Sequence, residues 1–175
     1  MIKYAITSPE FYSLEYLKSL NNKADFVLLR DKTINNYKDL AKNFLNYTKD
    51  FNYKKILHQD YNLANELKAD GVHLTSNQFG SIKRAKELNL LTLISTHSMQ
   101  EVKKAKDLGA DIVTFSPIFT TPNKGKPKGL DALKETIECF DIKVIALGGI
   151  ISKKQIEDIA PLKPYGFASI RYFLQ

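Results

Sequence analysis

The chain of 175 residues is 43% hydrophobic and 26% charged, which suffices for one sizeable core and leaves little material for a second domain. Its formal net charge is +7, but the lysines are dispersed and lack the interleaved aromatic side chains of a nucleic-acid platform. No apolar run is long enough to cross a bilayer, and the N-terminus lacks a secretory pattern. We therefore expect one domain over residues 1–175, cytoplasmic, that binds neither nucleic acid nor membrane.

Hydrophobic periodicity predicts short strands that alternate with amphipathic helices along the whole chain. The predicted strands are Ile2–Thr7, Asp25–Arg30, Lys55–Gln59, Gly71–Ser76, Leu91–Thr96, Ile112–Pro117, Lys143–Gly148 and Gly166–Arg171. The predicted helices are Pro9–Leu20, Tyr37–Lys49, Tyr61–Lys68, Ser81–Leu88, Gln100–Leu108, Leu130–Cys139 and Ser152–Ile159. Such regular alternation indicates parallel strands joined by helical crossovers.

A weak internal repeat favours closure of these strands into a barrel. An Ala-Asp pair precedes every second predicted strand, at Asp25, Asp70 and Asp111, a spacing of roughly two strand-plus-helix units. The predicted fold class is therefore α/β, a small TIM (β/α)8 barrel. Its C-terminus is truncated and lacks the final helix, so we expect the bottom or flank of the barrel to be exposed and covered by a second copy in a homodimer.

The single cysteine, Cys139, ends a predicted helix and has no partner for an internal disulfide. We expect it to serve ordinary helix packing rather than catalysis.

Basic residues follow two of the predicted strands, at the barrel end where ligands bind. Arg30 and Lys32 stand two positions apart after the second strand, and Asn123–Lys128 forms a concentrated basic loop after the sixth strand. Helix-breaking residues within this loop suit an anion-binding lid that carries Lys124, although a merely solvated loop would have the same composition.

Two glycines follow the seventh predicted strand. Gly148 and Gly149 would let backbone amides approach an anion, and Ser152 would cap the next helix. Together with Ala168–Arg171 after the eighth strand they predict a phosphate-binding rim, because the seventh and eighth loops commonly hold phosphate in such barrels. The alternative is that the glycines only satisfy a tight turn.

The three histidines differ in what their positions predict. His73 lies within the fourth strand and is expected to point into the structure, in a packing role. His97 follows Ser95 at the end of the fifth strand, where it either faces the ligand or acts in capping or support. His58 ends the third strand at the rim and is a candidate proton carrier.

Three segments recur together in one order and carry a family resemblance: Ala69–Leu74, Ser116–Thr121 with Lys124, and Ile145–Ile150. On these segments the chain resembles the thiamine phosphate synthase and TenI superfamily as a divergent member, and the resemblance runs from the first strand to the last. It implies a barrel that binds thiazole phosphate and, in the synthase, joins it to a pyrimidine pyrophosphate with release of pyrophosphate. Thiamine phosphate would be the product.

The resemblance also implies roles for individual residues. Arg30 and Lys32 match the cations that contact the pyrophosphate, and Lys124 matches the lysine after the sixth strand, so these three are the expected catalytic residues. The expected substrate-binding residues are His58, Ser95, His97, Thr121, Gly148, Gly149, Ser169 and Ile170.

The sequence departs from the synthase pattern on the metal side. Gln59 and Gln78 replace the expected metal carboxylates, which leaves Asp60 as the only nearby acid on its loop. One carboxylate with neutral amides is expected to hold Mg²⁺ weakly. Leu28 stands where the synthase usually has a glutamine on the pyrimidine side.

These departures leave three functions open. The first is synthase chemistry. The second is a TenI-like thiazole tautomerase that uses His58 or His97, although Pro117 stands where the TenI proteins carry their histidine. The third is a non-catalytic barrel that binds thiazole phosphate or thiamine phosphate.

Overall fold

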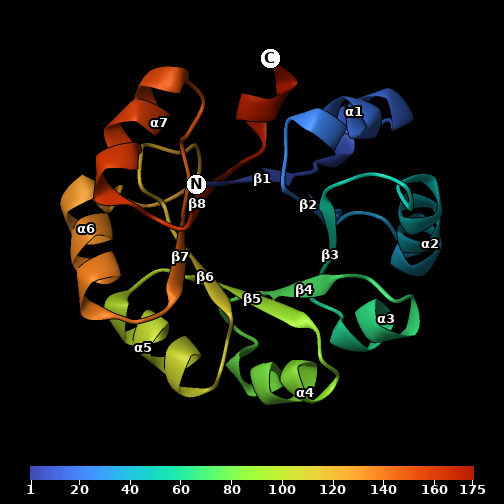
Figure 1. Ribbon diagram of the computed structural model, residues 1–175, viewed down its shortest axis with the longest axis horizontal. Coiled ribbons are helices and arrows are strands. Elements are labelled where there is room, and N and C mark those ends of the chain that lie inside the picture. The colour runs from blue at the N-terminus through green and yellow to red at the C-terminus, as the bar shows by residue number, and fades with distance from the viewer.

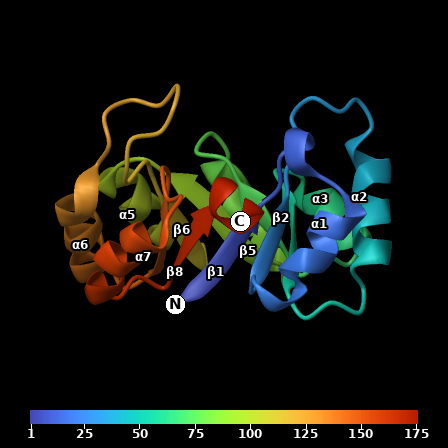
Figure 2. The same ribbon diagram turned by 90° about the horizontal axis from the view of Figure 1, so that it is seen from above.

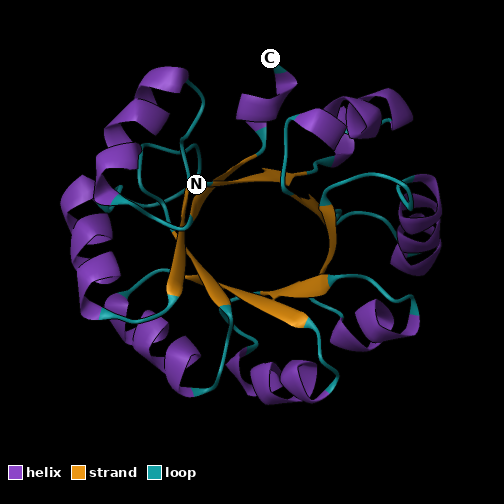
Figure 3. Ribbon diagram, viewed as in Figure 1, coloured by secondary structure: helices purple, strands orange, loops and turns teal.

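The computed structural model describes residues 1–175, and its strands form a closed barrel in chain order, β1 to β8, every neighbouring pair parallel. The helices form a ring around this barrel (Figures 1 and 3). The strands are β1 Ile2–Ile6, β2 Phe26–Leu29, β3 Lys54–His58, β4 Gly71–Leu74, β5 Leu91–Thr96, β6 Ile112–Phe115, β7 Lys143–Leu147 and β8 Gly166–Ser169. The predicted (β/α)8 fold is confirmed.

Most predicted helices occur within two residues of their expected bounds. They are α1 Leu14–Ser19, α2 Tyr37–Tyr47, α3 Tyr61–Glu66, α4 Ile82–Glu87, α5 Met99–Asp107, α6 Gly129–Cys139 and α7 Lys153–Ile159. The prediction of one continuous helix over Pro9–Leu20 is wrong. Tyr12 and Ser13 are extended, and the Ser13 hydroxyl accepts a hydrogen bond from the backbone of Tyr16, so the chain makes a 3-10 turn at Pro9–Phe11 before α1 begins.

Side chains alternate across the barrel wall and build two cores. Tyr4, Phe26 and Leu28 belong to the cluster inside the barrel, whereas Ala5 and Val27 belong to the larger cluster between strands and helices. This alternation follows from the two-residue period of a strand. The interior is therefore a packed core, and space for a ligand remains only at its ends.

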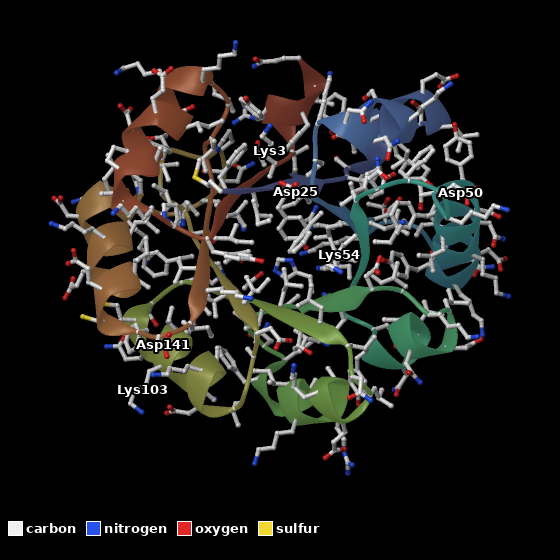
Figure 4. The ribbon with its side chains drawn as sticks, viewed as in Figure 1. Lys3, Asp25, Asp50, Lys54, Lys103 and Asp141 are labelled. Atoms are coloured by element: carbon white, nitrogen blue, oxygen red, sulfur yellow. The ribbon has the colours of Figure 1, made fainter.

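The aspartates of the internal repeat share one structural role at the N-terminal end of the barrel. Each carboxylate accepts a hydrogen bond from a backbone N–H of the preceding strand: Asp25 from Lys3 at 2.7 Å, Asp70 from Lys55 at 2.7 Å and Asp111 from Thr92 at 2.8 Å. Figure 4 shows Lys3 and Asp25 beside each other. The repeat thus ties strands together in pairs.

The flank that was expected to be exposed is covered in part by the residues after β8. A 3-10 turn, Arg171–Leu174, lies between α7 and α1 (Figure 1). Its Tyr172 and Phe173 rings pack on Phe167 of β8 at 5.2 and 6.0 Å between centroids. Phe167 is only 1% exposed, so this aromatic cluster covers the outer face of β8. Leu14, Ile151 and Leu174 around this turn remain 49%, 39% and 38% exposed, and the homodimer stays a prediction.

Cys139 is exposed, which corrects the expectation that it serves helix packing. Helix α6 buries Leu133 and Thr136 against the barrel, whereas Cys139, the last residue of the helix, is exposed. None of the helices is both long and apolar enough to span a membrane.

Candidate functional site

A cavity of about 450 Å³ opens at the C-terminal ends of the strands and contains most of the predicted site. The predicted residues that line it are Arg30, Lys32, His58, Ser95, His97, Thr121, Lys124, Gly148 and Ile170. The loop between β6 and α6, which carries Lys124, rises above this end of the barrel in the side view (Figure 2). The structure therefore brings together side chains from the ends of six strands.

Three cations gather at the mouth of the cavity. The pKa of Lys32 is lowered, first by the charge of Arg30, then by burial and the charge of Lys124. Burial lowers the pKa of Arg30. The charge of Asp31 offsets this effect on Arg30 in part, but its carboxylate accepts hydrogen bonds from the backbone and hydroxyl of Thr33 within its own turn and forms no ion pair with Arg30. No acidic residue lines the cavity, so an anion of several charges would relieve the mutual repulsion of the cations.

The glycine pair after β7 forms the tight turn that the sequence suggested, and its contact with an anion stays a prediction. Gly148 and Gly149 have φ angles of +99° and +70°. A Cβ on Gly148 would lie 2.8 Å from the Cα of Pro117, and one on Gly149 would lie 2.6 Å from the carbonyl oxygen of Thr120. The tight turn and the close approach of the β6–α6 loop therefore both require glycine.

The same turn leaves backbone donors free. The N–H groups of Gly148, Gly149 and Ile170 make no hydrogen bond within the chain. They belong to loops that line a small hollow of about 110 Å³ beside the main cavity. Unpaired N–H groups at the seventh and eighth strands suit a phosphate.

The other two predicted rim residues use their hydroxyls within the protein. The Ser169 hydroxyl donates to the carbonyl of Ile150 at 2.7 Å and accepts from the N–H of Tyr172 at 3.1 Å. The Thr121 hydroxyl donates to the carbonyl of Phe119 at 3.0 Å. Ser169 thus joins the seventh and eighth loops and fixes the position of the rim.

His58 and His97 both line the cavity. Burial, with the charges of Arg30 and Lys32, lowers the pKa of His58 to about 4, so its ring is neutral near pH 7. His97 has a supporting role as well, because its Nδ1 lies 3.1 Å from the carbonyl of Ser116 and its N–H donates to the Glu101 carboxylate. His97 therefore has the predicted supporting role, and its contact with a ligand stays a prediction.

His73 is buried in the barrel interior, as predicted, but it does more than pack. Its Nδ1 lies 2.8 Å from the Tyr4 hydroxyl and its Nε2 lies 3.1 Å from the Ser95 hydroxyl. Tyr4 was not among the residues predicted for the site. The signal was its position: Tyr4 is a polar-tipped residue on an inward-facing register of β1.

The residues expected on the metal side do not fit Mg²⁺. Asp60 does not line the cavity; its carboxylate accepts from the N–H of Leu63 at 2.9 Å as the N-cap of α3. The Gln78 side chain accepts from the N–H of Thr75 and donates to the carbonyl of Gln59, so it holds two loops together. No group of three or more His, Cys, Asp or Glu side chains is placed to hold a metal ion. Mg²⁺ prefers carboxylate oxygens, and the cavity offers none.

Several lining residues were not predicted as ligand contacts. They are Ile6, Gln59, Thr75, Ser76, Asn77, Ser116, Pro117 and Leu147. All lie at strand ends or in the first residues of the following loops, which is the signal that could have found them. Leu28 lies one layer deeper, 2% exposed in the interior cluster, and does not line the cavity.

A second hollow, of about 530 Å³, lies at the opposite end of the barrel. It is lined by Asp111 and Asp141 as well as by lysines, and Asp111 forms an ion pair with Lys86 at 2.6 Å. It therefore lacks the unopposed positive charge of the C-terminal cavity.

The fold and the cavity at the C-terminal ends of the strands define a (β/α)8 barrel with a cationic site at the usual end. Within that class the family described as thiamine monophosphate synthase matches residues 4–172, and the chain belongs to this family.

Individual relatives agree. The chain is 36% identical to "Putative thiamine-phosphate synthase 2" of Aquifex aeolicus, over 98% of this chain and 97% of that protein. It is 29% identical to "Thiamine-phosphate synthase" of Methanococcus vannielii, over 84% of this chain and 75% of that protein. Among solved structures, thiamine phosphate pyrophosphorylase from Pyrococcus furiosus superposes with a TM-score of 0.83 at 24% identity, over 97% of this chain and 85% of that one. This last similarity supports the fold.

Proposed function

We propose that this protein is a transferase of thiamine biosynthesis that couples a pyrimidine pyrophosphate to thiazole phosphate and releases pyrophosphate. One observation carries the proposal: the cavity with three cations adjoins a small hollow rimmed by unpaired backbone N–H groups, and no acidic side chain lines either of them. Two substrates that each carry a phosphate group would find an anion site at either end. The full-length relatives named for this activity support the same assignment.

The reaction requires little proton transfer by the protein. The bond between the pyrimidine methylene carbon and the pyrophosphate oxygen breaks, and its electron pair leaves with the pyrophosphate. The thiazole nitrogen then forms the new carbon–nitrogen bond with its lone pair. Arg30, Lys32 and Lys124 would stabilise the charge that develops on the departing pyrophosphate, because fixed cations in a partly buried site act strongly on developing negative charge.

The two ends of the site would hold the reactants in line. Donors at Gly148, Gly149 and Ile170 would bind the thiazole phosphate, and the cations at the end of β2 would bind the pyrophosphate. Orientation of two reactants in one cavity replaces a bimolecular encounter and contributes a large share of the rate. No step of this proposal passes through Mg²⁺, because the donor set does not suit the ion.

The test is a direct assay with both precursors, measured once with Mg²⁺ and once with a chelator. We expect one pyrophosphate for each thiamine phosphate formed, both with Mg²⁺ and with the chelator. Absence of thiamine phosphate at high enzyme concentration in both would reject the proposal. Matched loss of product in Arg30→Ala, but not in the distant and exposed Arg84→Ala, would place the chemistry in this cavity.

A second candidate, a thiazole tautomerase, is favoured by one observation on His58. Its ring lines the cavity, and no hydrogen bond of the structure involves either ring nitrogen, so a nitrogen is open to a proton of a bound thiazole. The lowered pKa of His58 makes it a weak base until an anionic ligand offsets the charges of Arg30 and Lys32. Isotope exchange into a thiazole carboxylate phosphate tests this function. Exchange that persists unchanged when both His58 and His97 are replaced by glutamine would rule it out.

Binding without turnover is the remaining alternative. Calorimetry would identify it by tight thiamine phosphate binding from a protein that converts no precursor. The proposed partners are thus phosphorylated thiazole and pyrimidine precursors or thiamine phosphate, and we propose the cytoplasm as the location, where an exposed thiol such as that of Cys139 stays reduced.

A further inference from the structure

A line of three polar groups crosses the otherwise apolar interior of the barrel. It runs from the Tyr4 hydroxyl on β1 to His73 on β4, at 2.8 Å, and from His73 to the Ser95 hydroxyl on β5, at 3.1 Å. Tyr4 is 0% and His73 is 3% exposed, and their rings stack with centroids 5.7 Å apart. Ser95, at the upper end of the line, reaches the cavity.

Hydrogen-bond accounting fixes which atom donates at each step. Burial raises the pKa of Tyr4 well above its ordinary value, so the phenol keeps its proton. His73 Nδ1 is the only hydrogen-bond partner of that hydroxyl. A buried O–H without an acceptor is costly, so Tyr4 donates and Nδ1 accepts.

The bond from Tyr4 then determines which nitrogen of His73 carries the proton. Burial lowers the pKa of His73 to about 3, so the ring is neutral near pH 7 and carries one proton. With Nδ1 accepting from Tyr4, that proton sits on Nε2 and is donated to Ser95 Oγ.

Ser95 is left with one unused proton. Its hydroxyl forms no hydrogen bond to any group of the protein other than His73, and its side chain lines the same cavity as Arg30 and Lys32. We propose that Tyr4 and His73 are positioning residues that make Ser95 a hydrogen-bond donor toward an acceptor atom of the ligand, a ring nitrogen of the pyrimidine. The assignment of that ligand rests on the proposed function.

As a consequence, Ser95 would select ligands by the group that their ring presents to it. A heteroaromatic ring that presents a lone pair to Ser95 is accepted, whereas one that presents an N–H there meets a donor facing a donor. Inorganic pyrophosphate and the pyrimidine pyrophosphate share the anion and differ in the ring, so the ratio of their affinities isolates this contact.

The first measurement is the tautomer itself, by ¹⁵N NMR of the ring nitrogens of the ligand-free protein. We expect the proton of His73 on Nε2 in the wild type and a mixture of tautomers in Tyr4→Phe. A wild-type proton on Nδ1 would overturn the proposal, whatever the protein binds. This arm is independent of the proposed function.

The second measurement is calorimetry with the two pyrophosphates. We expect Tyr4→Phe and Ser95→Ala each to weaken the pyrimidine pyrophosphate about tenfold, the effect of one lost hydrogen bond, and to leave inorganic pyrophosphate within about twofold. The double variant should be no weaker than Ser95→Ala, because both changes act on one contact. Equal weakening of both ligands, or additive losses, would overturn the proposal.

The matched control is Tyr53→Phe. Tyr53 is a tyrosine, 1% exposed, whose hydroxyl hydrogen-bonds the Leu17 carbonyl far from the cavity. The Tyr53→Phe variant should lose stability without any change in the His73 tautomer or in the ratio of the affinities for the pyrimidine pyrophosphate and inorganic pyrophosphate. If the wild type binds inorganic pyrophosphate but shows no preference for the pyrimidine compound, the proposed function fails, and the tautomer measurement still decides the role of Tyr4 and His73.

Discussion

Replacement of Gly149 by alanine tests how the phosphate rim is built. The residue has φ +70°, a region in which an L-residue pays about 1–2 kcal/mol. The new Cβ would also lie 2.6 Å from the Thr120 oxygen and 2.8 Å from the Phe119 carbonyl carbon. These are backbone atoms, so the β6–α6 loop must move, and such overpacking typically costs about 1–3 kcal/mol. We expect Gly149→Ala to lose about 2–5 kcal/mol.

Urea unfolding followed by circular dichroism measures this loss, and two glycines provide controls. Gly109 has φ +88° but nothing within 4 Å of an added Cβ, so Gly109→Ala reports the backbone strain alone. Gly80 has neither strain nor a close neighbour, and its replacement should be neutral. The difference between Gly149→Ala and Gly109→Ala is the contribution of the loop contact. If the two variants are equally stable, the rim does not depend on the close approach of the loops.

Further predictions concern charge and pH. Arg30→Ala should weaken inorganic pyrophosphate about 10- to 100-fold, the effect of a charge-assisted hydrogen bond, whereas Arg84→Ala on the exposed face of α4 should not; calorimetry that finds equal affinities for both would contradict the cation site. The affinity for pyrophosphate should not rise when Mg²⁺ replaces a chelator. Asp60→Asn keeps an N-cap side chain and should bind pyrophosphate as the wild type does. A Mg²⁺-dependent gain in affinity that Asp60→Asn abolishes would show that Asp60 holds the metal. Because burial lowers the pKa of His73 to about 3 while the unfolded chain titrates near 6.5, the unfolded state takes up the extra proton as the pH falls below 6.5. Stability should therefore drop with acidification, by about 2 kcal/mol from this residue between pH 7 and pH 5, and His73→Gln should flatten that slope in unfolding curves; an unchanged slope would show that His73 is not the buried base.

Local patterns predicted the fold because each strand and helix carries its own periodicity. The aspartates before β2, β4 and β6 repeat in the sequence because each makes the same hydrogen bond at the same end of the barrel. The split of the first helix was missed, since the capping of α1 by Ser13 competes with continuation of the helix and periodicity does not weigh the two. The aromatic cluster of Phe167, Tyr172 and Phe173 was missed because it depends on contacts between a strand and a turn.

The candidate site was predictable to the extent that strand ends meet at one rim. Arg30, Lys32 and Lys124 follow two strands that are distant in sequence, and the closed barrel brings them to one cavity. The position of Asp60 after β3 suggested a metal ligand, whereas in the structure its carboxylate caps α3, a contact that periodicity does not show. Whether an acidic side chain faces a cavity or a helix end is a matter of a single rotamer.

The sequence by itself determined the barrel, the family and the cationic, glycine-bearing rim, because these depend on local periodicity and on which residue types follow each strand. Only the tertiary structure decided what each polar group does once placed. Tyr4, His73 and Ser95 lie far apart in the chain, and their line of hydrogen bonds exists only because closure of the barrel sets β1, β4 and β5 around one narrow interior. A hydrogen bond depends on distances of tenths of an ångström, and such distances come from the packing of the whole barrel.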